Sequence, residues 1–362
     1  MSLFQIIFMI GQILILTLIL IHNAPIMAWV ERRGAALMQN RLGPNRIGPL
    51  GLFQSAADGI KFIFKEDQIP GHVSKFYYVL APLVSLVPSF LTFAVIPYGS
   101  QIDLGGGQIL KFQIADLNVG ILFTLAIASL GVYGIIMSGW ASNSKYAMMG
   151  SLRSSSQMIS YELSMGLSLV GILMVFSSVK LGDIAAAQGQ TLLQLGPIAL
   201  PKWGIFIQPL GFLIFMTSVF AETNRLPFDL PEGESEIVAG YHLEYGSMKF
   251  AILQMAEYNN MLTGSGLLAT LYFGGWQMLF PLGQIYSHLA LSGMTADWVR
   301  VAFEIGSFTV KVLFFMWFFV WVRWTLPRFR YDQLMDLGWK VMLPLSLVNL
   351  FITAVMISYG VI

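Results

Sequence analysis

Long apolar runs separated by polar stretches dominate the pattern of this 362-residue chain. Eight runs come close to the length of about 20 residues that an α-helix needs to cross the hydrocarbon core of a bilayer. They lie near residues 3–29, 76–98, 117–140, 158–178, 205–221, 250–274, 300–322 and 338–361. The runs are continuously apolar and do not alternate, which excludes membrane-spanning strands. The pattern predicts an all-α polytopic membrane protein with about eight transmembrane helices in a single membrane domain, residues 1–362.

The positions of the basic residues predict an orientation. Most of the 20 Lys and Arg residues follow the first, third, fifth and seventh runs. Because cytoplasmic loops are enriched in positive charge, we expect these loops in the cytoplasm and both termini on the outer, periplasmic side. The first run lacks a basic leader and is too long for the apolar core of a signal peptide, so we expect it to be a retained span.

Two loops have a pattern of their own. In the first cytoplasmic loop, residues 31–75, apolar side chains recur at helical spacing over residues 50–67. This spacing favours an amphipathic helix in the membrane interface, and a helix that binds a partner or packs on the loop is the alternative. Upstream, Gly and Pro in RLGPNRIGP, residues 41–49, predict an irregular turn. The outer loop, residues 99–116, is expected to form a short hairpin.

The composition narrows the functional classes. Hydrophobic residues make up 56% of the chain, the mean hydropathy is +0.71, the net charge is +1 and there is no cysteine. A near-neutral chain without a basic patch does not favour nucleic-acid binding. Thiolate-bound clusters are excluded, and no zinc, haem or nucleotide-binding motif occurs. We therefore predict no metal site, no bound cofactor and no catalytic residue that acts in this chain alone.

Acidic residues at membrane depth are candidate functional groups because burying a charge there is costly. Glu162 and Glu257 have no basic residue within one helical turn. Burial without a cation favours the protonated carboxyl group, so both are candidate proton carriers, unless a hydrated cleft or another helix satisfies them. Asp116 lies at the mouth of the third run. Glu304 and Lys311, seven residues apart, share a helix face and are expected to form a salt bridge.

The segment 222–249 holds six of the 19 carboxylates of the chain. Pro227 and Pro231 oppose a regular helix before Glu232. Charge counting alone favours a solvated acidic loop. Apolar residues between the acids, and nearby Tyr and His side chains, favour a structured surface beside the membrane instead.

Several motifs then resemble one family. They are ERR at 31–33, RLGPNRIGPLG at 41–51, DGIKFIFKED at 58–67, SYE at 160–162, the acidic segment 221–250, FGGW at 273–276 and PRFRYDQLMDLGWK at 327–340. In this order and spacing they resemble the H subunit of NADH-quinone oxidoreductase, the family of mitochondrial NADH dehydrogenase subunit 1 of respiratory complex I. The resemblance extends over the whole chain.

The resemblance implies a membrane subunit of a proton-translocating NADH:quinone oxidoreductase. Such a subunit lines the tunnel for quinone, ubiquinone or menaquinone, which enters from the bilayer beside the first span. It carries a carboxylate relay toward antiporter-like subunits. FMN and iron–sulfur clusters belong to partner subunits of the peripheral arm, and small membrane subunits lead to the antiporters. The location implied is the cell inner membrane, or the mitochondrial inner membrane.

The resemblance also carries over site residues. Those expected near the quinone tunnel are Glu31, Arg32, Arg33, Arg41, Arg46, Asp58, Lys61 and Arg225. Those expected in the proton relay are Glu162, Glu222, Asp229, Glu232, Glu234, Glu236, Glu244 and Glu257. Asp116 joins the relay on membrane depth alone. Of these, Glu162, Glu232 and Glu236 are the leading relay candidates.

Three alternative functions stay open at this point. The chain could serve the same role in a related complex whose electron donor is ferredoxin, coenzyme F420 or hydrogen. It could be an independent secondary ion transporter, although no paired internal repeat is visible. It could also be a structural anchor for a peripheral arm, which would leave Glu162 and Glu257 without a purpose.

Overall fold

The fold is known from a computed structural model that describes residues 2–105, 108–195, 198–230, 233, 238–278 and 294–360. Each of the eight apolar runs coincides with a helix, as predicted. The helices are α1 (Leu3–Met38), α3 (Lys75–Phe93), α4 (Gly120–Ala141), α5 (Lys145–Phe176), α8 (Pro209–Glu222), α10 (Ser247–Tyr272), α12 (Met294–Thr325) and α14 (Leu343–Ser358).

Six helical segments among the described residues are long and apolar enough to cross a membrane. They are α1, α3, α4, α5, α12 and the continuous segment Tyr331–Ser358, which joins α13 (Tyr331–Asp336), a π-helical turn η3 (Leu337–Met342) and α14. Helix α8 is apolar but has only 14 residues, and α10 is interrupted by polar side chains such as Glu257 and Asn259. The chain is thus a helical polytopic membrane protein, and the full count of eight spans stays a prediction.

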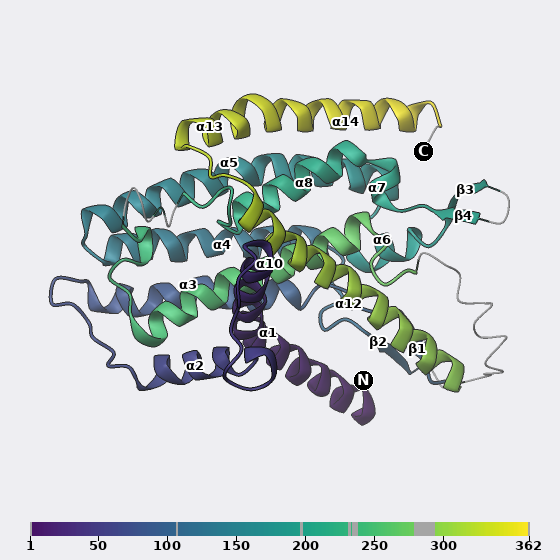
Figure 1. The fold of residues 1–362 in the computed structure, drawn as a ribbon. Coiled ribbons are helices and arrows are strands. Elements are labelled where there is room, and N and C mark those ends of the chain that lie inside the picture. The colour runs from purple at the N-terminus through teal and green to yellow at the C-terminus, as the bar shows by residue number, and fades with distance from the viewer. Residues whose placement is uncertain are drawn as a thin grey trace.

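Figure 1 shows helices α3, α4, α5, α8 and α14 running roughly side by side, with α12 crossing them obliquely. Both termini and two small hairpins lie toward the right end of this view, and the short helix α2 (Gln54–Phe64) lies toward the left. Side-chain amides tie the N-terminal part of α1 to the first hairpin, since Gln5 and Gln12 donate to the carbonyls of Ile109 and Lys111.

The predicted outer hairpin is confirmed. Strands β1 (Gln101–Asp103) and β2 (Ile109–Lys111) pair antiparallel, with Ile102 opposite Leu110. A second antiparallel hairpin, β3 (Thr191–Leu195) with β4 (Ile198–Pro201), was not predicted. The remaining short helices of the described residues are α6 (Leu181–Ala187), α7 (Gly204–Ile207) and the 3-10 turns η1 (Pro49–Gly51) and η2 (Gly240–His242).

The helix boundaries differ from the predicted ones at two places. Helix α1 starts with a capping box between Ser2 and Gln5 and continues to Met38, so residues 31–38 are helical and not loop. After the ERR motif and Gly34 come Ala35, Ala36 and Leu37, which are strong helix formers. Helix α5 likewise starts at Lys145, well before the apolar run at residue 158. In both cases polar residues extend a helix that hydropathy alone would stop.

The predicted irregular turn after α1 and the amphipathic helix are both present. The turn leads into η1, where Gly51 has φ +73° and a Cβ at this position would lie 2.3 Å from the carbonyl oxygen of Pro44. Helix α2 leaves the apolar side chains of Ile60, Ile63 and Phe64 exposed. Its location in a membrane interface stays a prediction.

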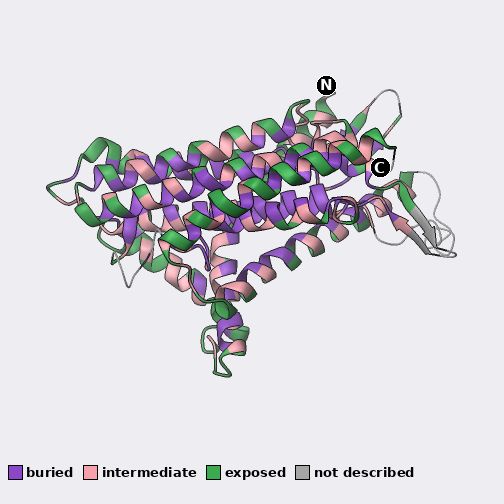
Figure 2. Cartoon of the chain, turned by 90° about the horizontal axis from the view of Figure 1, so that it is seen from above, coloured by how far each residue is buried: buried purple, intermediate pink, exposed green. Residues whose placement is uncertain are grey.

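Figure 2 shows that buried and exposed positions alternate along the helices of the bundle. Many large apolar side chains of α1, α12 and α14 are exposed. This distribution suits a surface that faces lipid. Small residues permit close helix contacts: a Cβ on Gly134 of α4 would lie 2.1 Å from the hydroxyl of Ser85 on α3. Such small-residue contacts are typical of helix packing in membranes.

The expected salt bridge between Glu304 and Lys311 is wrong. The Lys311 ammonium donates to the backbone carbonyls of Gly275, at 2.9 Å, and Gln277, beyond the end of α10. Glu304 accepts from the backbone N–H of Ser100 at 2.8 Å and lies 3.8 Å from Arg300. Seven residues place the two side chains on one face but about 10 Å apart along the axis, so nearer groups satisfy each of them.

Candidate functional site

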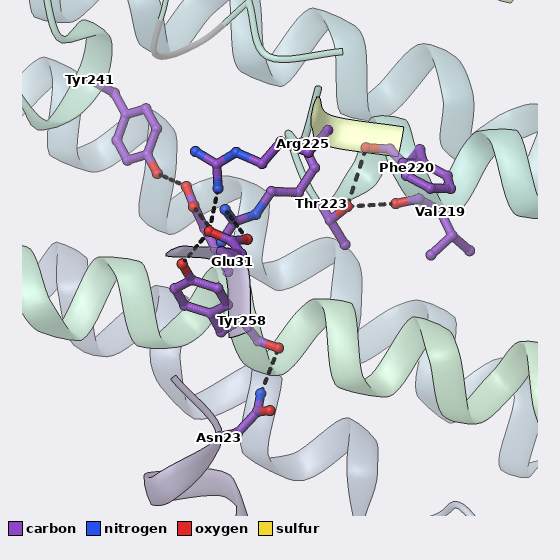
Figure 3. A network of polar contacts seen from close by, with 10 residues as sticks. Asn23, Glu31, Val219, Phe220, Thr223, Arg225, Tyr241 and Tyr258 are labelled. Carbon is purple, nitrogen blue, oxygen red and sulfur yellow. Dashed lines mark hydrogen bonds and ion pairs between the residues drawn. The ribbon is translucent and has the colours of Figure 1, made fainter. Parts of the chain in front are cut away.

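A buried network of charged residues centres on Glu31 of α1 (Figure 3). One carboxylate oxygen accepts from Arg225 at 3.2 Å. The other accepts from Arg323 of α12 at 2.6 Å and from the hydroxyl of Tyr258 on α10 at 2.9 Å. Only 9% of the Glu31 side chain and 7% of the Arg225 side chain are exposed. Burial of these charges is tolerated because each carboxylate oxygen has a donor.

The network continues through Arg225 to a second carboxylate. The guanidinium group of Arg225 lies 4.2 Å from the ring centroid of Tyr258 and 3.8 Å from an oxygen of Glu257. The other oxygen of Glu257 accepts from the hydroxyl of Tyr241 at 2.5 Å. Two glutamates and two arginines thus meet in one buried cluster, called the Glu31 network below, and their formal charges cancel.

Local contacts hold these side chains in place. The side-chain amide of Asn23, two turns before Glu31 on α1, donates to the carbonyl of Tyr258 at 2.8 Å (Figure 3). The segment that carries Arg225 is held by Gln157 of α5, which donates to the carbonyls of Ala221 and Phe228. Residues 223–225, 227, 228 and 230 are buried. The described start of the acidic segment is therefore a structured part of the protein core and not a solvated loop.

Glu222, the last residue of α8, has a different environment. Its carboxyl group makes no hydrogen bond or ion pair with another residue of the described ranges. Glu162 on α5, which is half-buried, interacts with it as a like charge. Two neighbouring acids without a cation favour sharing a proton.

Glu222 also borders two small cavities. One, of about 20 Å³, is bounded in part by Glu257 and Tyr241 of the Glu31 network. The other, also of about 20 Å³, lies among Thr92, Thr124 and Thr263. Each is large enough for about one water molecule.

The other acids predicted for the relay lie elsewhere or outside the described residues. Glu244 lies 3.9 Å from His72, near the start of α10. The backbone carbonyl of Asp229 accepts a hydrogen bond from Arg328. Glu232, Glu234 and Glu236 lie outside the described residues.

Asp116 is not part of the Glu31 network. Its carboxylate pairs with Lys111 at 2.5 Å and with Lys180 at 3.1 Å, in a polar cavity of about 530 Å³ that Glu304 also lines. Burial acts to raise the pKa of Asp116, but the two lysines outweigh it and leave the pKa below its ordinary value. Asp116 is therefore a paired, ionised group near the first hairpin.

The predicted tunnel residues on α1 and α2 form a separate, more exposed set. Arg32 donates to Asp58 at 2.6 Å, and Lys61 lies 3.5 Å from the same carboxylate. Burial acts to raise the pKa of Asp58, but hydrogen bonds from Arg32 and Gln54 outweigh it, so the pKa is lowered. This contact links the end of α1 to the amphipathic helix.

The remaining arginines lie on the turn after α1. Arg33 is half-buried and packs near Gly43, whose Cβ would lie 2.9 Å from its side chain. Arg41 donates to Gln39 at 2.7 Å, and Arg41 and Arg46 are both exposed. Exposed arginines of this kind are available to a neighbouring protein of a larger assembly.

An apolar crevice of about 680 Å³ lies between α1 and α12. Its walls are almost entirely apolar, with Gln12, His22 and Asn23 among the few polar side chains. It reaches Met27, which is one helical turn before Glu31 on the same face of α1. The volume falls within the range of ligand sites, about 300–1,000 Å³.

Sequence reasoning missed three members of the site. Arg323, Tyr258 and Asn23 make hydrogen bonds that no local pattern predicts. Tyr241, which donates to Glu257, is one of the Tyr and His side chains singled out beside the acidic residues of segment 222–249. A weak signal existed for Arg323, a basic residue at the end of an apolar run. No group of acidic, His or Cys residues suitable for a metal ion occurs among the described residues.

The fold and the site define a class: a multi-span helical membrane protein with a charge-neutral buried network beside a pair of neighbouring acids. A model of the NADH dehydrogenase family matches residues 10–354. Several bacterial proteins named as the H subunit of NADH-quinone oxidoreductase are similar over nearly the full length. The protein of Bdellovibrio bacteriovorus is 44% identical, over 96% of this chain and 95% of its own. That of Thermomicrobium roseum is 47% identical, over 92% of each chain. The chain belongs to the NADH dehydrogenase family, among the H subunits of NADH-quinone oxidoreductase.

Proposed function

We propose that this chain is the membrane subunit of a proton-translocating NADH:quinone oxidoreductase. In this role it forms the membrane side of the quinone tunnel and carries a carboxylate relay from that tunnel toward antiporter-like subunits. Its eight apolar runs all span the inner membrane as helices, and both termini lie on the outer, periplasmic side. The reaction is taken from the names of the similar proteins. The site contains residues that suit the quinone tunnel and residues that suit the relay.

The crevice between α1 and α12 supports the tunnel side of the proposal. Its apolar walls suit an isoprenoid tail, and it points toward the Glu31 network. Helix α2 exposes Ile60, Ile63 and Phe64, which suits a helix that lies in the membrane interface. The quinone is the substrate, while FMN and iron–sulfur clusters are held by partner subunits of the peripheral arm.

The observation that carries the relay is the contrast between Glu31 and Glu222. Reduction of a quinone consumes protons and changes the charge in a cavity of low dielectric constant. A carboxylate with three donors, such as Glu31, is held in its charged form and can only transmit that change. Glu222 and Glu162 have each other as like-charged neighbours and can respond by taking up or releasing a proton.

The function is tested by isolating the native complex in mild detergent. The chain should copurify with the other subunits of the complex, and the preparation should reduce quinone with NADH in an inhibitor-sensitive way. If ferredoxin, coenzyme F420 or hydrogen drives the reduction of quinone and NADH does not, that compound is the electron donor in place of NADH. Ion transport by the isolated, reconstituted chain would instead favour an independent transporter.

The relay is tested separately with Glu162→Gln. This variant should assemble normally, since Glu162 has no ion pair among the described residues, but quinone-reductase turnover and proton pumping should both fall. Gly166→Ala, one turn further along α5 where a Cβ meets nothing within 4 Å, is a matched control. Normal pumping by Glu162→Gln would remove Glu162 from the relay.

A further inference from the structure

We infer that two single-water sites, joined by Glu222 and Asn260, extend the proton path from the Glu31 network deeper into the helix bundle. Asn260 is the positioning residue at this junction. This inference rests on the proposed function, because it names how that relay crosses the gap beyond Glu257.

The two water-sized cavities described above share two lining residues, Glu222 and Asn260. Every other lining residue belongs to one cavity only. The side chains of Glu222 and Asn260 are also alike in making no hydrogen bond with another group in the described part of the chain. An Asn amide carries both donors and acceptors, so it can hold a water molecule on each side.

The first cavity has a buried polar group with no protein partner. The hydroxyl of Ser85 is buried, lines this cavity and makes no hydrogen bond with the described residues. Buried polar groups are nearly always satisfied, by protein or by ordered water. A water in this cavity would satisfy Ser85 and contact Glu257, Tyr241 and Glu222, which line the same space.

The second cavity lies further along the same helix faces. On α10, Glu257, Asn260 and Thr263 follow one another at intervals of three residues, and on α3, Ser85 and Thr92 are seven residues apart. Seven residues of helix correspond to about 10 Å. The second cavity is therefore displaced by about this distance toward the C-terminal end of α10, where the hydroxyls of Thr92 and Thr263 lie 3.4 Å apart.

Together these residues form a sequence of sites for one proton. A proton that reaches the first water from the Glu257 side can form an O–H bond with the Glu222 carboxylate. Glu222 can then release its proton to the second water, which returns Glu222 to the charged form. Asn260 itself exchanges no proton in this sequence, and its role is to keep both waters in reach of Glu222.

The glycine at position 131 allows a direct test. Gly131 of α4 lines the first cavity, and a Cβ added there would meet nothing within 4 Å, so Gly131→Ala adds a methyl group without a clash. Alanine also favours a helix more than glycine does. The variant should fold and assemble, yet exclude the first water. Gly166→Ala on α5, also without a contact within 4 Å, adds the same methyl group away from both cavities.

Two variants of Asn260 complete the set. Asn260→Leu keeps the size of the side chain but removes its hydrogen bonds, and Asn260→Ser keeps a hydroxyl and leaves room for water. In the intact complex, we expect Gly131→Ala and Asn260→Leu to lower proton pumping and coupled turnover about tenfold, the factor for one lost hydrogen bond of about 1.4 kcal/mol. Gly166→Ala should match the parent, and Asn260→Ser should restore most of the activity.

High-resolution electron cryo-microscopy of the intact complex gives a readout independent of activity. One ordered water is expected in each cavity of the parent, and none in the first cavity of Gly131→Ala. Empty cavities in the parent, or parental pumping by Gly131→Ala with the water absent, would overturn the inference.

Glu222→Gln separates the two proposals: if it abolishes pumping while Gly131→Ala and Asn260→Leu do not, the relay stands and the water junction fails. If Glu222→Gln pumps normally, the relay itself fails.

Discussion

Glu31 and Glu222 are acidic residues on two helices of the same bundle, yet the structure surrounds them differently. Glu31 accepts hydrogen bonds from Arg225, Arg323 and Tyr258. Glu222 has no such donor among the described residues and borders two cavities of about 20 Å³. The difference teaches that carboxylates of one helix bundle need not share one role. In the proposed relay, we expect Glu31 to keep a fixed charge and Glu222 to change its protonation.

The largest effect is expected from removing the shared cation of the Glu31 network. Arg225→Met leaves Glu31 with one arginine and removes the guanidinium beside Glu257. Breaking a buried ion pair from one side costs about 3–5 kcal/mol. We expect the amount of assembled complex and its thermal midpoint to fall, as measured by native electrophoresis and differential scanning fluorimetry.

The matched control for that change is Arg225→Lys. It keeps the positive charge but loses the planar guanidinium that reaches Glu31 and stacks on Tyr258. The amount of assembled complex and its thermal midpoint should fall clearly less for Arg225→Lys than for Arg225→Met. Equal stability of Arg225→Met and the parent would show that the Glu31 network does not hold the fold together.

The next largest effect concerns Glu222. Glu222→Gln removes a proton-exchanging group without leaving a buried charge unpaired, so assembly should be retained. Coupled turnover and proton pumping should fall about 100-fold, the scale of a lost proton-transfer group. Glu31→Gln provides the contrast, since it leaves Arg225 and Arg323 with Glu257 as the one remaining carboxylate of the network and should lower stability as well. If the two variants showed the same profile, the distinction between fixed and exchanging carboxylates would be lost.

A smaller effect is expected for the two tyrosines of the network. Tyr258→Phe removes one donor to Glu31, and Tyr241→Phe removes the donor to Glu257. Each should cost about 1.5 kcal/mol, the lower end for a hydrogen bond to a charged group. Thermal midpoints should show a similar loss for both. Because Tyr241 also lines the first cavity, we expect only Tyr241→Phe to slow proton pumping. A greater pumping defect in Tyr258→Phe would contradict that assignment.

The smallest effect belongs to the exposed contact between α1 and α2. Asp58→Asn removes the ion pair with Arg32, half of whose side chain is exposed, so the cost should stay below about 1 kcal/mol. The lowered pKa of Asp58 means that the pair contributes above the ordinary value of 3.8 and is lost as the pH falls through the lower folded-state value. Hydrogen exchange of the α2 amides should therefore show a small difference between parent and variant that is the same at pH 5 and pH 8. A difference that disappears at pH 5 would contradict this pairing.

The sequence predicts the helices well because each reflects a local property, the length of an apolar run. The hairpin in the loop 99–116 and the amphipathic helix α2 follow from equally local patterns. The Glu31 network does not, because its ion pairs join residues 194 and 292 positions apart. Only the packing of α1 against α10 and α12 brings these side chains together.

The error at Glu304 and Lys311 has the same origin. Helical periodicity places two residues on one face, but it does not show which groups on other elements are closer. Lys311 finds the carbonyls beyond α10, and Glu304 finds the backbone of Ser100. The environments of Glu162 and Glu257 show the converse: neither has a local cation, but Arg225 reaches Glu257 from another segment.

Infrared difference spectroscopy of the intact complex on quinone reduction tests the central claim most directly. A carboxyl band that changes with reduction should be present in the parent, absent in Glu222→Gln and still present in the assembled fraction of Glu31→Gln. Such a result would show that Glu222 exchanges a proton while Glu31 keeps its charge. A band that persists in Glu222→Gln and disappears in Glu31→Gln would contradict the account.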